Sequence, residues 1–171
     1  MNLYRRGQQA GENKWVRHGA FALLLLAIYV GVRTYQQRDL VLGQAPAFEV
    51  ETLSGTRFVL PGDTRPTLVY FWATWCPVCR VEHGSIDALV AEYRVVAVAM
   101  QSGTNAELAG YLREHPWRVP TFNDLSGEQA ANWGVRVTPT FFIVDSQRQI
   151  RYREVGYTTE LGLRFRLWLA S

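Results

Sequence analysis

The sequence is poor in cysteine, and the two cysteines it has cannot form a structural framework. Among 171 residues only Cys76 and Cys79 are present, three positions apart. A disulfide scaffold needs pairs that are distant in sequence, and closing so short a loop removes little entropy from the unfolded chain. A tetrahedral zinc site made of cysteines would need a second pair. The cysteine count therefore excludes both a disulfide scaffold and a cysteine zinc site.

Excess positive charge is absent beyond the first 40 residues. Residues 1–40 hold six basic and two acidic side chains, a net charge of +4, whereas residues 41–171 hold twelve arginines and thirteen acids, a net charge of −1. The alkaline pI of 9.1 therefore belongs to the N-terminal segment. Because no basic cluster with interleaved aromatic residues follows, nucleic-acid binding is not expected.

One long apolar run is present, at residues 19–32, and Arg33 ends it. A cleaved secretory signal would fit this length, but no Ala-x-Ala cleavage site follows the run. A spanning helix needs about 20 residues, a length reached when the flanking aromatic residues Trp15 and Tyr35 are included. Four consecutive leucines leave no polar face, which disfavours a buried helix of a soluble domain.

We therefore expect an uncleaved signal anchor, with cleavage as the alternative. More positive charge precedes the run than follows it, which keeps the N-terminus in the cytoplasm and exports the remainder. The predicted organisation is a cytoplasmic segment at residues 1–18, a transmembrane signal anchor at 19–35, a polar tether at 36–44 and one exported domain at 45–171.

The exported domain has the pattern of a mixed α/β fold. Two short strands at 48–51 and 57–60 flank Ser54-Gly55-Thr56 and indicate a β-hairpin. Continuous apolar runs at 67–72 and 95–100 indicate strands that are covered on both faces. Helices are expected at 77–93, 106–115, 128–133 and after Thr158 or Thr159, with further strands at 140–144 and 149–155. This order predicts a mixed central sheet flanked by helices.

The cysteines stand where a buried strand gives way to a helix, in Trp75-Cys76-Pro77-Val78-Cys79. The free N–H groups and the dipole of a helix N-terminus stabilise an anion. Cys76 at the N-cap should therefore have a lowered thiol pKa, and Pro77 suits the first helical position. Cys79 lies one turn later, beneath Cys76, where it can attack a mixed disulfide. A chance pair of structural cysteines is the alternative.

A second motif, Val137-Thr138-Pro139-Thr140-Phe141-Phe142, opens a strand with proline. Proline is unusual there unless it makes a special peptide bond or lies on an edge strand. Together, the two motifs resemble the thioredoxin superfamily over about residues 45–171. Within it the chain is similar to the membrane-tethered bacterial proteins of the TlpA/ResA/DsbE type, and most similar to the suppressor-of-copper-sensitivity group.

This resemblance implies roles for particular residues. Cys76 would be the attacking cysteine and Cys79 the resolving one, and Thr138-Pro139 would form a cis-proline loop facing them. Glu82 matches an acid of the reducing members and would accept a proton from Cys79, although a solvated helix residue is the alternative. Residues expected to contact substrate are Trp75, Pro77, Val78, Thr138 and Pro139.

Three positions depart from the family pattern. Tyr70 replaces the buried carboxylate that plain thioredoxin has six residues before its first cysteine, and Gly84 replaces a helix proline. Pro77 comes first between the cysteines, as in oxidising members, whereas proline usually comes second in reductants. The direction of electron flow is therefore left open by the sequence.

The expected activity is thiol–disulfide exchange on exported cysteine-containing proteins, at the periplasmic face of a bacterial inner membrane. A membrane or periplasmic redox partner would reset the cysteine pair, and no cofactor besides the redox-active disulfide is expected. The alternative is a copper-handling protein, because Cys76, Cys79 and His83 fall on one helical face and would suit Cu(I). A fold retained only for binding is a third possibility.

Overall fold

The computed structural model describes residues 4–171, which form two compact units divided between Arg38 and Asp39. The first unit is a single helix, α1 (Tyr4–Gln37). Its segment Lys14–Gln37, 24 residues with a mean hydropathy of 1.7, is long and apolar enough to cross a membrane. At 1.5 Å per residue such a segment is about 36 Å long, which exceeds the thickness of about 30 Å of a bilayer hydrocarbon core.

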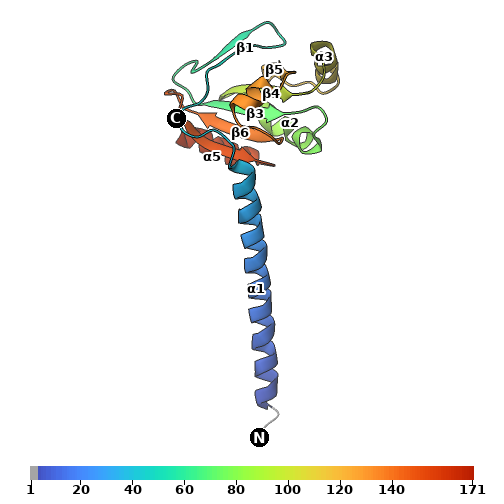
Figure 1. Cartoon of the computed structure of the whole chain (residues 1–171), viewed down its shortest axis with the longest axis vertical. Coiled ribbons are helices and arrows are strands. Elements are labelled where there is room, and N and C mark those ends of the chain that lie inside the picture. Colours follow the sequence, from blue (N-terminus) through green and yellow to red (C-terminus); the bar gives the residue numbers. More distant parts are fainter. Residues whose placement is uncertain (1–3) are drawn as a thin grey trace. The chain divides into compact units, whose positions relative to one another are not determined.

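The second unit is built on a five-stranded sheet with the strand order β5-β4-β3-β6-β7 (Figure 1). The strands are β3 (Thr67–Trp72), β4 (Arg94–Met100), β5 (Thr121–Asp124), β6 (Thr140–Val144) and β7 (Ile150–Val155). The pairs β3–β4 and β4–β5 are parallel, whereas β6 is antiparallel to both β3 and β7. Strands β1 (Phe48–Glu51) and β2 (Arg57–Leu60) form the predicted hairpin as a separate two-stranded sheet.

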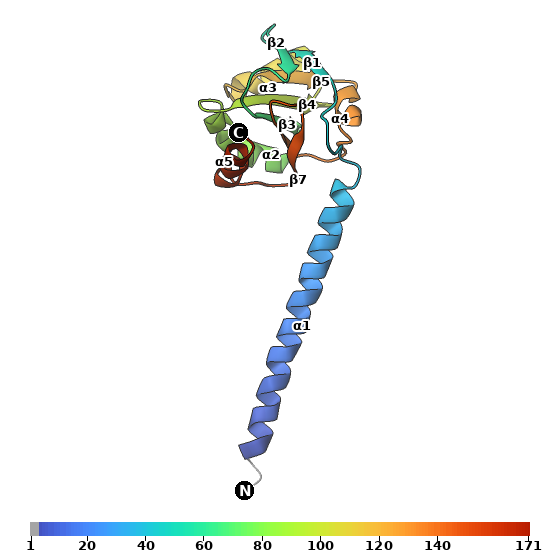
Figure 2. The same cartoon turned by 90° about the vertical axis from the view of Figure 1, so that its left-hand side faces the viewer.

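Helices cover both faces of the sheet (Figure 2). Helices α2 (Pro77–Leu89), α3 (Asn105–Glu114) and α5 (Glu160–Leu169) contribute buried residues to the hydrophobic cluster on one face. Helix α4 (Glu128–Asn132) and the β1–β2 hairpin contribute to the cluster on the other face. The mixed α/β fold predicted from the order of apolar runs is confirmed.

The central strand β3 is buried at all six positions. Side chains of a strand alternate between its two faces. Val69 and Phe71 accordingly enter one hydrophobic cluster, whereas Leu68, Tyr70 and Trp72 enter the other. Because both faces of the strand are buried, its sequence is one continuous apolar run. The same packing fixes the end of the strand, where the cysteine loop begins.

Trp133 is the central aromatic residue of the cluster beneath the hairpin. It is fully buried and contacts the rings of Phe48, Phe71 and Phe142 at centroid distances of 5.9, 5.8 and 4.8 Å. Replacing Trp133 with alanine should lower the free energy of unfolding by about 3–5 kcal/mol, because a large cavity is left. Urea unfolding followed by circular dichroism measures this loss. Replacing the exposed Leu125 with alanine should change it by less than about 0.5 kcal/mol, and equal losses would contradict the packing assigned to Trp133.

Candidate active site

The two cysteines lie at the N-terminal end of α2, four residues after β3. Cys76 is the N-cap residue with extended backbone angles, and Pro77 occupies the first helical position. The Cys76 Sγ accepts a hydrogen bond from the Cys79 backbone N–H at 3.1 Å. The Cys76 carbonyl accepts one from the Arg80 N–H at 3.3 Å. One N–H donor of the first helical turn, that of Cys79, is thus directed at the Cys76 sulfur.

Cys76 and Cys79 form a disulfide, with a Cα–Cα distance of 5.3 Å. Cys76 is 4 % exposed and Cys79 is fully buried, so only the first of the two residues reaches solvent. When the pair is reduced, the helix dipole and the directed N–H group favour the thiolate of Cys76 over its thiol. The residue of the pair that reaches solvent is therefore also the one whose thiolate the helix stabilises.

The loop before the disulfide is attached to the loop that follows β4. The Thr74 backbone N–H donates to the Ser102 hydroxyl at 3.1 Å, and the Trp75 indole N–H donates to the Gln101 carbonyl at 3.3 Å. The Trp75 ring remains 60 % exposed. Pro77 and Val78 are exposed as well, so three of the predicted substrate-contacting residues present accessible apolar surface beside the cysteines.

The Thr138–Pro139 peptide bond is cis. Phe71 near the end of β3 pairs with Thr140 at the start of β6, so the Pro139 loop and the cysteine loop leave the sheet at the same end of adjacent strands. Pro139 is buried and its carbonyl accepts a hydrogen bond from the Gly156 N–H at 2.8 Å. The Thr138 hydroxyl is buried and has no hydrogen-bond partner among the described residues.

Glu82 is completely buried within α2, unlike the solvated residue that was the alternative interpretation. Its Oε1 accepts a hydrogen bond from the Thr158 backbone N–H at 2.6 Å. Burial raises the pKa of Glu82 from 4.5 to about 7, while the Thr158 N–H and the Tyr70 hydroxyl oppose this rise by stabilising the carboxylate. A carboxyl group with this pKa is half ionised near neutral pH, as a proton acceptor or donor requires.

Tyr70 faces Glu82 from the neighbouring strand. Burial raises the pKa of the Tyr70 phenol, and the negative charge of Glu82 raises it further. In the described part of the chain neither the phenol oxygen nor Glu82 Oε2 has a partner within the geometric limits of a hydrogen bond. The carboxyl group that the sequence analysis singled out, Glu82, therefore lies beside Tyr70, the position at which plain thioredoxin has its buried acid.

The copper-site hypothesis built on His83 is wrong. Among residues 4–171, no three histidine, cysteine or acidic side chains are placed to hold a metal ion. The His83 ring packs instead against Trp117 at 4.3 Å and Trp72 at 5.0 Å, and burial lowers its pKa to about 4. Cys76 lies outside the helix as its N-cap, so the assumed helical spacing does not apply to its sulfur.

Three contacts at the site could not be read from sequence. Ser102 and Gln101 hold the cysteine loop, and Thr158 binds Glu82 from 76 positions away. Two of these three contacts use main-chain atoms of the distant residue, which every residue type has. No side-chain pattern in the sequence therefore predicts these main-chain contacts. Only the path of the chain brings the distant residues to the site.

Comparison with known proteins agrees with this geometry. Residues 41–153 match the model of the AhpC/TSA family. The chain is 32 % identical over 161 residues to a thioredoxin-like protein of Haemophilus influenzae, covering 92 % of this chain and 96 % of that protein. It is 31 % identical to the thiol:disulfide interchange protein DsbE of Pseudomonas fluorescens, covering 81 % and 86 %.

A solved structure of a thioredoxin-family thiol:disulfide interchange protein from Chlorobium tepidum shares the fold, with a TM-score of 0.65 at 21 % identity, covering 77 % of this chain and 98 % of that one. The disulfide-bonded cysteine pair at the start of α2 is the group through which such a fold exchanges disulfides. The chain therefore belongs to the AhpC/TSA family and is a thioredoxin-like protein disulfide oxidoreductase related to the thiol:disulfide interchange proteins DsbE.

Proposed function

We propose that Cys76 attacks the disulfide of an exported protein and that Cys79 resolves the resulting intermediate. The Cys76 thiolate forms a mixed disulfide with one substrate sulfur, and the other substrate sulfur leaves as a thiolate. Cys79 then attacks the Cys76 sulfur, which re-forms the Cys76–Cys79 disulfide and releases the second substrate thiolate. The substrate gains two electrons and the protein loses two. The observation that carries this order of roles is the position of Cys76 at the N-cap of α2, where it reaches solvent, whereas Cys79 is fully buried inside the helix.

Glu82 would take the proton of the Cys79 thiol before the second attack. Its pKa of about 7 matches this role at neutral pH, and its burial within the cysteine helix keeps water from competing for the proton. Tyr70 and the Thr158 N–H would stabilise the carboxylate until the proton arrives. In the reverse reaction, in which the protein oxidises a substrate, the same group would return the proton to Cys79.

The substrate backbone would lie between the two loops that leave the sheet together. In the cis-proline loop Thr138-Pro139, the main chain of Thr138 would offer hydrogen bonds to an extended segment around the substrate cysteine, because the Pro139 carbonyl already binds the Gly156 N–H. Trp75, Pro77 and Val78 would cover its side chains from the other flank with apolar surface. An unfolded or locally open exported protein fits such a site, because its cysteine can enter in extended form.

The N-terminal helix would fix the domain to a membrane, where a redox partner would reach it. Segment Lys14–Gln37 would anchor the chain in a bacterial inner membrane, with the N-terminus in the cytoplasm and residues 45–171 in the periplasm. A second dithiol protein, in or at the membrane, would return two electrons to the Cys76–Cys79 disulfide. The likeness to suppressor-of-copper-sensitivity proteins would make non-native disulfides formed under copper stress a natural substrate.

Cys79→Ser tests the proposal directly. In this variant Cys76 can attack but nothing resolves the intermediate, so mixed disulfides with exported proteins should accumulate. Quenching cells with acid, alkylating free thiols and separating the proteins without reductant would show them as bands that disappear when reductant is added. Cys76→Ser is the matched control and should form none.

Trapping by Cys76→Ser and not by Cys79→Ser would reverse the assigned roles. If neither variant traps a protein while both remain folded and membrane-bound, exchange with exported proteins is not the function of this pair.

A further inference from the structure

The Tyr70 hydroxyl is a polar group in the middle of the apolar strand β3. Side-chain alternation places Tyr70, together with Leu68 and Trp72, on the sheet face that α2 covers. The residue is fully buried, and its oxygen has no hydrogen-bond partner among residues 4–171. A buried hydroxyl without a partner costs free energy that phenylalanine at the same position would avoid. The hydroxyl is thus a disadvantage for folding alone, which points to a use in the chemistry of the site.

The Tyr70 ring is held on two sides by other aromatic rings. Tyr70 pairs with Phe141 of β6 in the sheet register, and the two rings stack with centroids 4.9 Å apart and an interplanar angle of 17°. Trp117 meets the Tyr70 ring in a T-shaped contact at 6.3 Å. The packing therefore fixes the phenol oxygen in place, while its hydrogen can still turn about the C–O bond.

Glu82 is held through one of its two carboxyl oxygens. Oε1 accepts the Thr158 N–H at 2.6 Å, whereas Oε2 is buried and has no partner among the described residues. Besides burial, the pKa of Glu82 responds to the Thr158 N–H and to the Tyr70 hydroxyl, and both lower it. Tyr70 responds in turn to Glu82 on α2 and to Tyr111 on α3. Because Thr158 already binds Oε1, Oε2 is the oxygen available to the Tyr70 hydroxyl and to a proton.

We propose that Tyr70 is a positioning residue whose hydroxyl binds Glu82 in both of its protonation states. The Tyr70 O–H donates a hydrogen bond to the carboxylate. When Glu82 takes the proton of the Cys79 thiol, Cys79 is left as a thiolate and the proton lies on Oε2. The Tyr70 hydrogen then turns away, and the phenol oxygen accepts a hydrogen bond from the carboxyl O–H. The inference rests on the proposed role of Glu82 and adds the residue that keeps the proton at one oxygen.

A phenol suits this position better than a second acid. A carboxylate at position 70 would repel the charge of Glu82 and compete with it for the proton. Tyr70 stays neutral instead, because burial and the charge of Glu82 both raise the pKa of its phenol. A neutral hydroxyl can donate to the carboxylate and accept from the carboxylic acid, so it supports the transfer in either direction.

The test follows the two steps of exchange separately in the full chain, purified in detergent micelles. Reduced protein is mixed with an aromatic disulfide by stopped flow between about pH 5.5 and pH 9. The first equivalent of coloured thiol reports the attack by Cys76, and the second reports resolution by Cys79. Tyr70→Phe removes the hydroxyl and keeps the ring, and it is measured alone and combined with Glu82→Gln.

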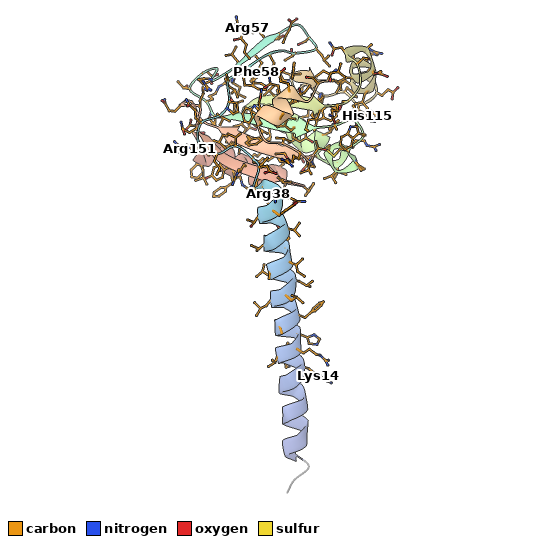
Figure 3. The ribbon with its side chains drawn as sticks, in the orientation of Figure 1. Lys14, Arg38, Arg57, Phe58, His115 and Arg151 are labelled. Carbon is orange, nitrogen blue, oxygen red and sulfur yellow. A yellow bond between two sulfur atoms is a disulfide. The ribbon has the colours of Figure 1, made fainter. Side chains whose placement is uncertain are left out.

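Tyr111→Phe is the matched control. Its hydroxyl is also buried and has no partner within the described chain. The Tyr111 ring stacks on His115 at 4.3 Å, and His115 lies at the margin of the domain (Figure 3). Loss of this hydroxyl should change either step by less than about twofold, because no role in the exchange is assigned to it.

Tyr70→Phe should slow the second step about fivefold at pH 7 and leave it unchanged at pH 9. The carboxylate loses a charge-assisted hydrogen bond and the carboxylic acid only a weaker one, so the pKa of Glu82 should rise from about 7 to about 8. About a tenth of Glu82 is then ionised at pH 7 instead of half. The first step should be unchanged at every pH. In the Glu82→Gln background, where no proton is exchanged, Tyr70→Phe should have no further effect.

Three outcomes would overturn the role of Tyr70 alone. They are a second step slowed equally at every pH, which would assign Tyr70 to packing, a pH profile identical to that of the unchanged protein, and further slowing in the Glu82→Gln background. If Glu82→Gln itself leaves the second step and its pH profile unchanged, the proposed proton transfer by Glu82 fails and the inference fails with it.

Discussion

Replacing Cys76 with serine should lower the rate of disulfide exchange by at least about a thousandfold, because the hydroxyl that replaces the thiolate is not a nucleophile at neutral pH. The N-cap position makes this sulfur the one that is activated, and Cys79 cannot take its place because it is fully buried. Stopped-flow measurement with an aromatic disulfide, which releases a coloured thiol, follows the reaction of the reduced protein.

Cys79→Ser should give a different time course in the same assay. The first attack by Cys76 proceeds, so one equivalent of coloured thiol is released and the reaction then stops. Val81→Ser changes an exposed residue of α2 that has no assigned role and should stay within about tenfold of the unchanged protein. A Cys76→Ser protein that still shows a full first turnover would mean that Cys79 is accessible and that the assigned order is incorrect.

Replacing Glu82 with glutamine should remove a fall in stability that the oxidised protein shows between about pH 4.5 and 7. Burial raises the folded-state pKa of Glu82 from 4.5 to about 7, so the folded protein holds a proton in this range that the unfolded chain has lost. The stability linked to this proton is complete below pH 4.5 and is lost as the pH rises through 7. By linkage the loss amounts to about 3 kcal/mol.

Urea unfolding of the oxidised protein at several pH values measures this effect as the difference between the unchanged protein and Glu82→Gln. The glutamine variant should be more stable than the unchanged protein by about 3 kcal/mol at pH 8, and the difference should vanish near pH 4. Glu128→Gln, on the surface of α4, is the control and should follow the unchanged protein at every pH. A difference that does not depend on pH would show that Glu82 ionises as an ordinary carboxyl.

Glu82→Gln also shows whether Glu82 assists the attack of Cys79 on the mixed disulfide or only packs in the core. Glutamine keeps the shape of Glu82 and its hydrogen bond from the Thr158 N–H, but it cannot take a proton. We therefore expect Glu82→Gln to slow the second step of exchange and leave the first step, attack by Cys76, largely unchanged. Equal slowing of both steps would indicate a general disturbance of the site.

Local features of the sequence were sufficient to predict the fold and the position of the cysteine pair at the start of a helix. The run at 67–72 predicted a strand buried on both faces, and Pro77 after Cys76 predicted a helix that begins at the first cysteine. Both inferences depend on neighbours in the chain, where side-chain alternation and helix capping act. The cis bond at Thr138–Pro139 also agrees with a signal visible locally, a proline that opens a strand.

The surroundings of Glu82 and His83 depended on segments far away in sequence. Both residues lie on α2 and look alike as polar residues of an exposed helix. Glu82 is bound by the Thr158 N–H in the turn before α5, and the His83 ring packs against Trp117. Neither partner can be identified without the path of the chain, since one contact is to a main-chain N–H and the other is generic aromatic packing.

The cysteine pair, its position at the start of a helix and the apolar segment near the N-terminus are thus determined by the sequence alone, because each follows from the order of adjacent residues. Only the tertiary structure decided three other properties. These are the pKa of the buried Glu82, the packing of His83 that leaves no copper site, and the exposure of apolar residues on one face of α5. These properties depend on which surfaces the fold brings together, and burial and electrostatic shifts arise from that contact and not from residue type.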